Sequence, residues 1–124
     1  MIWLWLLFIY LEALRNFYII EIKKMVPNYL ESFIIRGIAA IVHGVLLHVQ
    51  TWDDYKFIFV FQISSFYLTF DFILNWMRGK EMFFLGKNNA IDRFLRERPL
   101  LHIFVKTVAL ALTIFSLLKY YSHV

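Results

Sequence analysis

Residues 57–77, FIFVFQISSFYLTFDFILNWM, form an apolar run that contains one ionisable residue, Asp71. A helix of about 20 residues crosses the ~30 Å hydrocarbon core of a bilayer, so this run predicts a membrane-spanning helix. The runs 31–51 and 100–121 have a similar length and apolar character. The run 1–21 gathers its polar residues at one end instead of along one face. We therefore interpret it as a fourth span, the alternative being a helix that lies in the membrane interface.

The composition excludes several classes of protein. Hydrophobic residues make up 61% and aromatic residues 20% of the 124 residues, which is incompatible with a disordered chain and argues against a soluble monomer. The chain has no cysteine, which removes disulfides, thiolate zinc sites and cysteine nucleophiles. Its net charge of +4 comes from basic residues beside apolar runs, so we expect no nucleic-acid partner. The fold class is an all-α integral membrane protein, a four-helix transmembrane bundle in one domain, 1–124.

The loops predict an orientation. Lys23 and Lys24 lie between the first two spans, and the connection 78–99 carries six basic and three acidic residues. The turn 51–56 carries a net charge of −1. Because basic loops stay in the cytoplasm, we expect a multi-pass inner-membrane protein with both termini outside. If the first run lies in the interface, the N-terminus moves to the cytoplasm. This topology places several aromatic residues at the outer interface, namely Trp3, Trp5, Trp52, Tyr55, Tyr120 and Tyr121.

The connection 78–99 has structure of its own. Asn89 followed by Asp92 is typical of a helix N-terminus, and Ile91, Phe94 and Leu95 would share one face of a short helix. Arg93, Arg96 and Arg98 flank that face. A basic, half-apolar helix of this kind lies on an anionic leaflet and contacts lipid headgroups. The alternative is a solvated connector.

Polar residues within the spans lie at related depths. Ionisable groups are costly at the bilayer centre, so we expect them to face protein or water. Counted at 1.5 Å per residue, each span places one charge at a level ~10 Å from the inner boundary. We expect Asp71 to pair with Lys106 and Arg36, and Glu12 with Arg15, in a layer of net charge +1. The predicted layer comprises Glu12, Arg15, Arg36, Asp71, Asn75 and Lys106.

Three interpretations of this layer remain open. In the first, the ion pairs fix helix register and orientation. In the second, the layer lines a water-filled cytoplasmic vestibule that binds an anion or a headgroup, or passes ions. The third is a proton relay through Asp71 and His43.

The run 31–51 carries a histidine and three small residues. His43 lies near the bilayer midplane, where we expect a hydrogen bond to a neighbouring helix. The four histidines lie at unmatched depths, so we expect no metal and no cofactor. Gly37, Ala40 and Gly44 permit close helix packing, within the bundle or between subunits.

The sequence lacks a phosphate-binding loop, a dinucleotide fingerprint and a nucleophile elbow, and we expect no enzyme. Residues 71–93, DFILNWMRGKEMFFLGKNNAIDR, resemble a loop of small uncharacterised membrane proteins of bacteriophages and prophages. The resemblance covers about a fifth of the chain and brings no activity with it. It implies a holin-like protein or a membrane component of a virion.

These observations predict a homo-oligomer that forms or gates a conduit for ions or small solutes. Arg36, Asp71 and Lys106 would line its inner vestibule, and His43 would lie at the constriction. The alternative is a scaffold or anchor whose basic connection binds a partner or anionic lipid.

Overall fold

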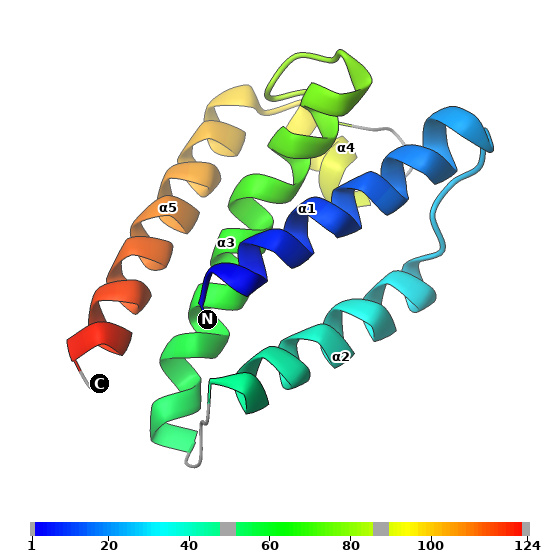
Figure 1. The fold of residues 1–124 in the computed structure, drawn as a ribbon. Helices are drawn as coiled ribbons and strands as arrows, with labels where there is room; N and C mark the ends of the chain where they lie inside the picture. Colours follow the sequence, from blue (N-terminus) through cyan, green and yellow to red (C-terminus); the bar gives the residue numbers. More distant parts are fainter. Residues whose placement is uncertain (1, 48–51, 86–89, 123–124) are drawn as a thin grey trace.

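The computed structural model describes residues 2–47, 52–85 and 90–122. Its helices are α1 (Trp3–Phe17), the π-helix η1 (Tyr18–Ile22), α2 (Tyr29–Leu46), α3 (Trp52–Arg78), α4 (Ala90–Arg96) and α5 (Pro99–Ser122) (Figure 1). No strand occurs in these ranges. Four helices are long and apolar enough to cross a membrane, counting α1 and η1 together. The predicted all-α bundle is therefore confirmed.

Local signals explain where the helices begin and end. Asn28 caps α2 by accepting a hydrogen bond of 3.0 Å from the backbone N–H of Glu31, as expected of an N-cap. Pro99 occupies the first position of α5, where its missing N–H is harmless. After α3, Gly79 adopts a φ of +69°, the left-handed conformation that ends many helices.

α3 begins earlier than the sequence predicted, at Trp52 instead of 57. The sequence analysis read 51–56 as a turn with a net charge of −1. An acidic side chain near a helix N-terminus is favoured by the helix dipole, and Asp53 pairs with Lys56 at 3.6 Å within the first turns of the helix. The acidic turn is thus part of the helix.

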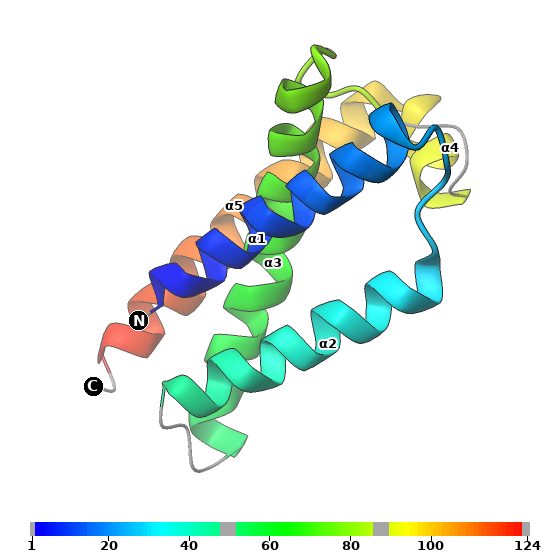
Figure 2. The ribbon, with the colours of Figure 1, turned by 45° about the vertical axis from the view of Figure 1, so that its right-hand side comes forward.

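α3 is the central helix of the bundle. α5 packs along one side of it and α1 along another, whereas α2 stands apart and approaches α3 near the loop that joins them (Figure 2). The core cluster consists of Trp5, Ile9 and Phe61. Both termini lie towards one end of the bundle, which we call the terminal end (Figure 1). The segments 23–28, 79–85 and 90–98 lie at the other, the basic end.

The burial of Trp5 corrects one expectation. The sequence analysis placed this residue with other aromatic residues at the outer interface, but its side chain is buried in the core. Trp3, by contrast, is exposed. The indole of Trp5 finds a hydrogen-bond partner inside the bundle, which removes the reason for its polar edge to stay near water.

Candidate functional site

The first polar cluster joins α1 to α2. We call Glu12, Arg15, Asn16, Glu31, Ser32 and Arg36 the α1–α2 cluster. At its centre, Glu12 has a side chain only 2% exposed. Arg15 binds this carboxylate at two points, with Nη2–Oε1 at 2.6 Å and Nε–Oε2 at 3.1 Å. The predicted pairing of Glu12 with Arg15 is present in the structure.

Arg36 reaches the same carboxylate from α2. Its Nε lies 3.4 Å from Glu12 Oε1, and its guanidinium lies over the rings of Phe66 and Phe70, at 4.6 and 4.8 Å from their centroids. The sequence analysis expected Arg36 to pair with Asp71, and the structure gives it a different partner. The charged face of α2 is directed towards α1. On the α3 side, Arg36 meets aromatic rings, which bind its guanidinium by cation–π contacts, instead of a carboxylate.

Two residues near the start of α2 complete this cluster. Arg15 donates to Glu31 Oε1 at 3.2 Å and to Ser32 Oγ at 2.9 Å. Neither residue was among the predicted site residues, although both follow the N-cap Asn28. With Glu31 included, two guanidiniums meet two carboxylates, so this cluster is neutral and does not carry the positive charge predicted for the layer.

The second polar cluster lies between α3 and α5. Lys106 is buried, and its ammonium lies 3.4 Å from Asp71 Oδ2. The ammonium also donates to the main-chain oxygen of Tyr67 and lies 3.9 Å from the centroid of that ring. The predicted pairing of Asp71 with Lys106 is therefore present, but in a cluster separate from Arg36. Five of the six predicted residues thus form two groups on different helix pairs instead of one shared layer.

Asn75 belongs to neither cluster. Its amide Nδ2 donates to the main-chain oxygens of Met82 and Phe84, both at 2.9 Å. These bonds fold the start of the 79–98 segment back against α3, and Leu85 is buried there. Asn75 therefore positions this segment, a role that its spacing from Asp71 did not indicate.

α4 brings a further carboxylate towards the second cluster. Burial and the negative charge of Asp71 raise the pKa of Asp92 to about 6, while Lys106 opposes the shift. His102 is buried on α5, and its Nε2 has no hydrogen-bond partner in the described part of the chain. Leu95 anchors α4 by burial, whereas Phe94 is exposed. Of the predicted apolar face, Leu95 is thus packed and Phe94 is not, and the side chain of Ile91 lies outside what the structure describes.

The basic residues of α4 and the segment after it face outward. Arg93, Arg96 and Arg98 are exposed, and the guanidinium of Arg98 lies 4.0 Å from the ring centroid of Phe94. The proposed N-cap Asn89 lies outside the described residues. At the same end of the bundle, Arg78 binds Glu21 at 2.6 Å, which ties the end of α3 to η1.

A third polar group occupies the terminal half of the bundle. Trp5 Nε1 donates to the main-chain oxygen of Gln62 at 3.0 Å. The Gln62 amide Nε2 lies 3.1 Å from the main-chain oxygen of Ala40 and 2.9 Å from His43 Nδ1. The rings of Trp5 and His43 stack with centroids 5.7 Å apart. We call these three residues the Trp5–Gln62–His43 node.

The sequence analysis predicted the hydrogen bond of His43 in this node but did not single out Gln62. His43 is bonded to a neighbouring helix, as the sequence analysis predicted. Gln62 was not singled out, although it is an amide in the middle of the apolar run 57–77 and is 1% exposed. A buried amide inside a membrane span needs a partner, and this rule was the signal that could have found it.

The small residues of α2 do not behave alike. A Cβ added at Gly44 would lie 2.7 Å from Tyr55 Cε2, so this glycine permits a close approach between α2 and α3. Ala40 offers its carbonyl to Gln62. Gly37 has nothing within 4 Å of an added Cβ, so it does not pack against another helix of this chain. The packing predicted at Gly37 is wrong within one copy, because α2 stands apart from α1 at this level.

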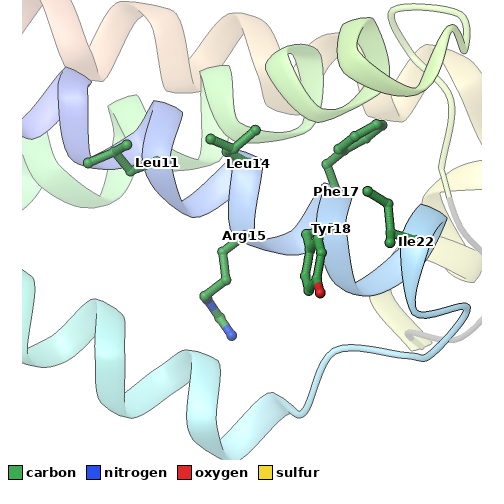
Figure 3. A pocket seen from close by; sticks show the side chains of 6 residues that line it. All are labelled: Leu11, Leu14, Arg15, Phe17, Tyr18 and Ile22. Carbon is green, nitrogen blue, oxygen red and sulfur yellow. The ribbon is translucent and has the colours of Figure 1, made fainter.

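An apolar hollow of about 480 Å³ lies along α1 and η1, towards the basic end. Figure 3 shows Arg15 pointing from it towards α2. Four of its lining residues are exposed, so the hollow is open to the outside of the bundle. Its lining residues are Leu11, Leu14, Arg15, Phe17, Tyr18 and Ile22.

The fold and these clusters define the class of the protein, a bundle of membrane-spanning helices with ion-paired charges inside the spans. No protein-family model, curated protein or solved structure matches the chain. The resemblance of residues 71–93 to phage membrane proteins stays a prediction.

Proposed function

We propose that the chain oligomerises in a membrane and forms or gates a conduit for ions or small solutes. The observation that carries this proposal is the partial exposure of the two arginines of the α1–α2 cluster. Arg15 and Arg36 lie within membrane-spanning helices, yet their side chains remain 25% and 33% exposed. Lipid tails offer no hydrogen bonds to a guanidinium. A water-filled vestibule between α1 and α2, open towards the basic end, supplies the missing solvation.

The Trp5–Gln62–His43 node would close this vestibule towards the terminal end. Its three side chains are buried, so a hydrated ion passes only if the node rearranges. In this proposal Arg15 and Arg36 line the vestibule and His43 lies at the constriction. The Lys106–Asp71 pair is packed between α3 and α5 and holds those helices together. We propose that the basic end faces the cytoplasm, following the loop charges.

Copies of the chain would pack through the outward face of α2. This face carries the open glycine Gly37 together with exposed Ile38, Ile41 and Val45. A small residue among apolar side chains lets two membrane helices approach closely. Replacing Gly37 by Leu should reduce chemical cross-linking between copies in lipid vesicles. Unchanged cross-linking would assign the interface to another face.

Flux through vesicles containing the purified protein tests the conduit. We expect Arg36→Gln to change both the rate and the cation–anion preference of salt flux, because it removes a charge from the vestibule. The double variant Asp71→Asn/Lys106→Met removes one charge of each sign from the α3–α5 cluster and should leave that preference unchanged. Wild-type vesicles without flux would reject the conduit, and normal flux in Arg36→Gln would reject the vestibule.

A second function is favoured by the basic end of the bundle. Arg93, Arg96 and Arg98 are exposed beside the exposed ring of Phe94, an arrangement suited to the surface of an anionic leaflet. In this alternative the protein is a non-transporting anchor. Replacing the three arginines by Gln should abolish preferential association with phosphatidylglycerol over phosphatidylcholine in nanodiscs. Lys119→Gln, at the opposite end of the bundle, is the control, and persistent preference in the triple variant would exclude this role.

A further inference from the structure

The apolar hollow along α1 and η1 runs as a stripe down one side of a span. Its lining residues Leu11, Leu14, Tyr18 and Ile22 follow one another at intervals of three or four positions, which is the spacing of one helix face. At 1.5 Å per residue the stripe is about 16 Å long. One leaflet contributes about half of the ~30 Å hydrocarbon core of a bilayer. The stripe therefore has the length of the acyl layer of a single leaflet.

The lining of the hollow is apolar, although Arg15 belongs to it. Glu12, Glu31 and Ser32 bind the guanidinium of this residue, and Figure 3 shows the side chain directed towards α2. Long charged side chains of this kind leave their aliphatic stem against apolar surroundings. An acyl chain lying in the hollow would therefore meet carbon atoms and no unpaired charge.

The π-helix η1 brings a cation to the end of the stripe that lies at the basic end of the bundle. The backbone N–H of Lys23 donates to the main-chain oxygen of Tyr18 at 3.1 Å, a bond between residues five apart that is characteristic of a π-helix. Five residues of α-helix would turn Lys23 away from Tyr18 by about 140°. In η1, the Lys23 ammonium lies 5.5 Å from the centroid of the Tyr18 ring, which lines the hollow. The π-helix thus sets a positive charge beside the hollow.

This cation has no counter-charge on the protein. Within the described part of the chain, no carboxylate pairs with Lys23, and its side chain is exposed. The nearest acidic residue along the chain is Glu21, which already binds Arg78 at 2.6 Å and Lys24 at 3.8 Å. An apolar stripe of single-leaflet length that ends at an unpaired ammonium is complementary to a phospholipid whose headgroup carries a net negative charge.

We propose that the hollow along α1 and η1 binds one anionic phospholipid from the leaflet at the basic end, with the headgroup phosphate on Lys23 and an acyl chain against Leu14 and Leu11. Phosphatidylcholine offers the same acyl chains, but its headgroup has no net charge and gains less from the ammonium. The site does not use the arginines of α4 and requires no ion flux. Its test is therefore independent of both functions proposed above.

Photo-cross-linking in nanodiscs tests this site. Full-length protein is illuminated with phosphatidylglycerol that carries a diazirine in the middle of one acyl chain, diluted in phosphatidylcholine, and the labelled residues are identified by mass spectrometry. Wild-type protein should be labelled preferentially within residues 11–18. Added phosphatidylglycerol without the diazirine should compete for this label, whereas the same amount of phosphatidylcholine should not.

A matched pair of lysine variants tests the headgroup contact. Lys23→Gln should weaken the labelling of residues 11–18 about fivefold, the contribution of one basic residue near an anionic membrane surface. Lys119→Gln is the control. It also removes a lysine that lies over an aromatic ring, with its ammonium 5.7 Å from the centroid of Phe115, but at the terminal end, and it should leave the labelling unchanged.

A matched pair of leucine variants tests the acyl-chain contact. Leu14→Trp places a larger side chain in the hollow and should displace the label from it. Leu112→Trp on α5 is the control, because the two leucines are 43% and 44% exposed, and it should have no effect. The competition experiment uses wild-type protein, so it decides the inference even if Leu14→Trp fails to fold.

Three results would overturn the inference. Labelling spread evenly over the exposed faces of α1 and α5 would show lipid that surrounds the bundle without a preferred site. Equal competition by phosphatidylcholine would remove the selectivity for an anionic headgroup. Labelling that is unchanged in Lys23→Gln but lost when Arg93, Arg96 and Arg98 are replaced by Gln would assign the lipid to α4.

Discussion

The indole nitrogen of Trp5 lies 3.0 Å from the main-chain oxygen of Gln62, which joins residues 57 positions apart in the sequence. This bond anchors the first helix to the central helix near the terminal end. It also orients the Trp5 ring against His43. The same contact therefore serves both the packing of α1 on α3 and the orientation of the Trp5 ring.

Replacing Trp5 by Phe should destabilise the bundle. Phe keeps most of the apolar surface but cannot donate the hydrogen bond, and such a loss is worth ~1 kcal/mol. Trp3→Phe is the matched control, because Trp3 is exposed. Unfolding equilibria in mixed micelles would measure both variants, and equal stability of the two would show that the Trp5 bond contributes nothing.

Glu12→Gln should be far more damaging. Glu12 neutralises Arg15 and Arg36 from a buried position, and removing one member of a buried ion pair costs about 3 kcal/mol or more. Glu31→Gln removes a carboxylate that is 61% exposed and should cost less than ~1 kcal/mol. The two variants have the same chemistry, so the difference between their unfolding free energies isolates burial. A difference near zero would contradict the buried placement of Glu12.

The glycines of α2 provide a second matched pair. Gly44→Ala places a methyl group 2.7 Å from Tyr55 Cε2, so either the ring or the helix must move and stability should fall. Gly37→Ala meets open space and should gain up to ~1 kcal/mol from helix propensity in detergent solutions where the protein is monomeric. Adding Tyr55→Ala to Gly44→Ala should recover part of the loss. Two equally destabilising glycine variants would argue against the close approach at Gly44.

The docking of α4 should depend on pH through Asp92. Its pKa rises from 3.8 to about 6 in the folded protein, so the docked helix binds the proton more tightly than the free segment does. The stabilisation is therefore complete below pH 3.8 and is lost as the pH rises through about 6. Hydrogen exchange of residues 90–96, corrected for its intrinsic pH dependence, should show less protection above pH 6. Asp92→Asn should flatten this dependence, and an unchanged profile would assign it to another group.

The spans were predictable because they depend on local composition. The predicted run 100–121 corresponds to the helix Pro99–Ser122 in the structure. The proline defines where this helix begins. The charged layer was only partly predictable. Counting residues gives depth along each helix, and it found the Lys106–Asp71 pair correctly. Counting residues does not show which neighbouring helix a side chain faces. The sequence analysis therefore assigned Arg36 to a carboxylate on α3 instead of to Glu12 on α1.

The node at the terminal end was the least predictable feature. Tryptophan is enriched at membrane interfaces on average. This average preference does not predict that the Trp5 indole bonds a backbone oxygen inside the bundle. Gln62 drew no attention because it is uncharged, although its amide joins α3 to α2. Polar uncharged residues in spans should be given the same weight as charged ones, since both need partners.

The ion pairs have a consequence for how the protein is made. Arg15 finds Glu12 within its own helix, Arg36 finds the same residue, and Lys106 finds Asp71. In each pair the acid is synthesised before the base. A ribosome delivering this chain N-terminus first therefore releases every one of these cations after a counter-charge has already emerged, so no helix has to wait in the translocon for a later one to neutralise its cation.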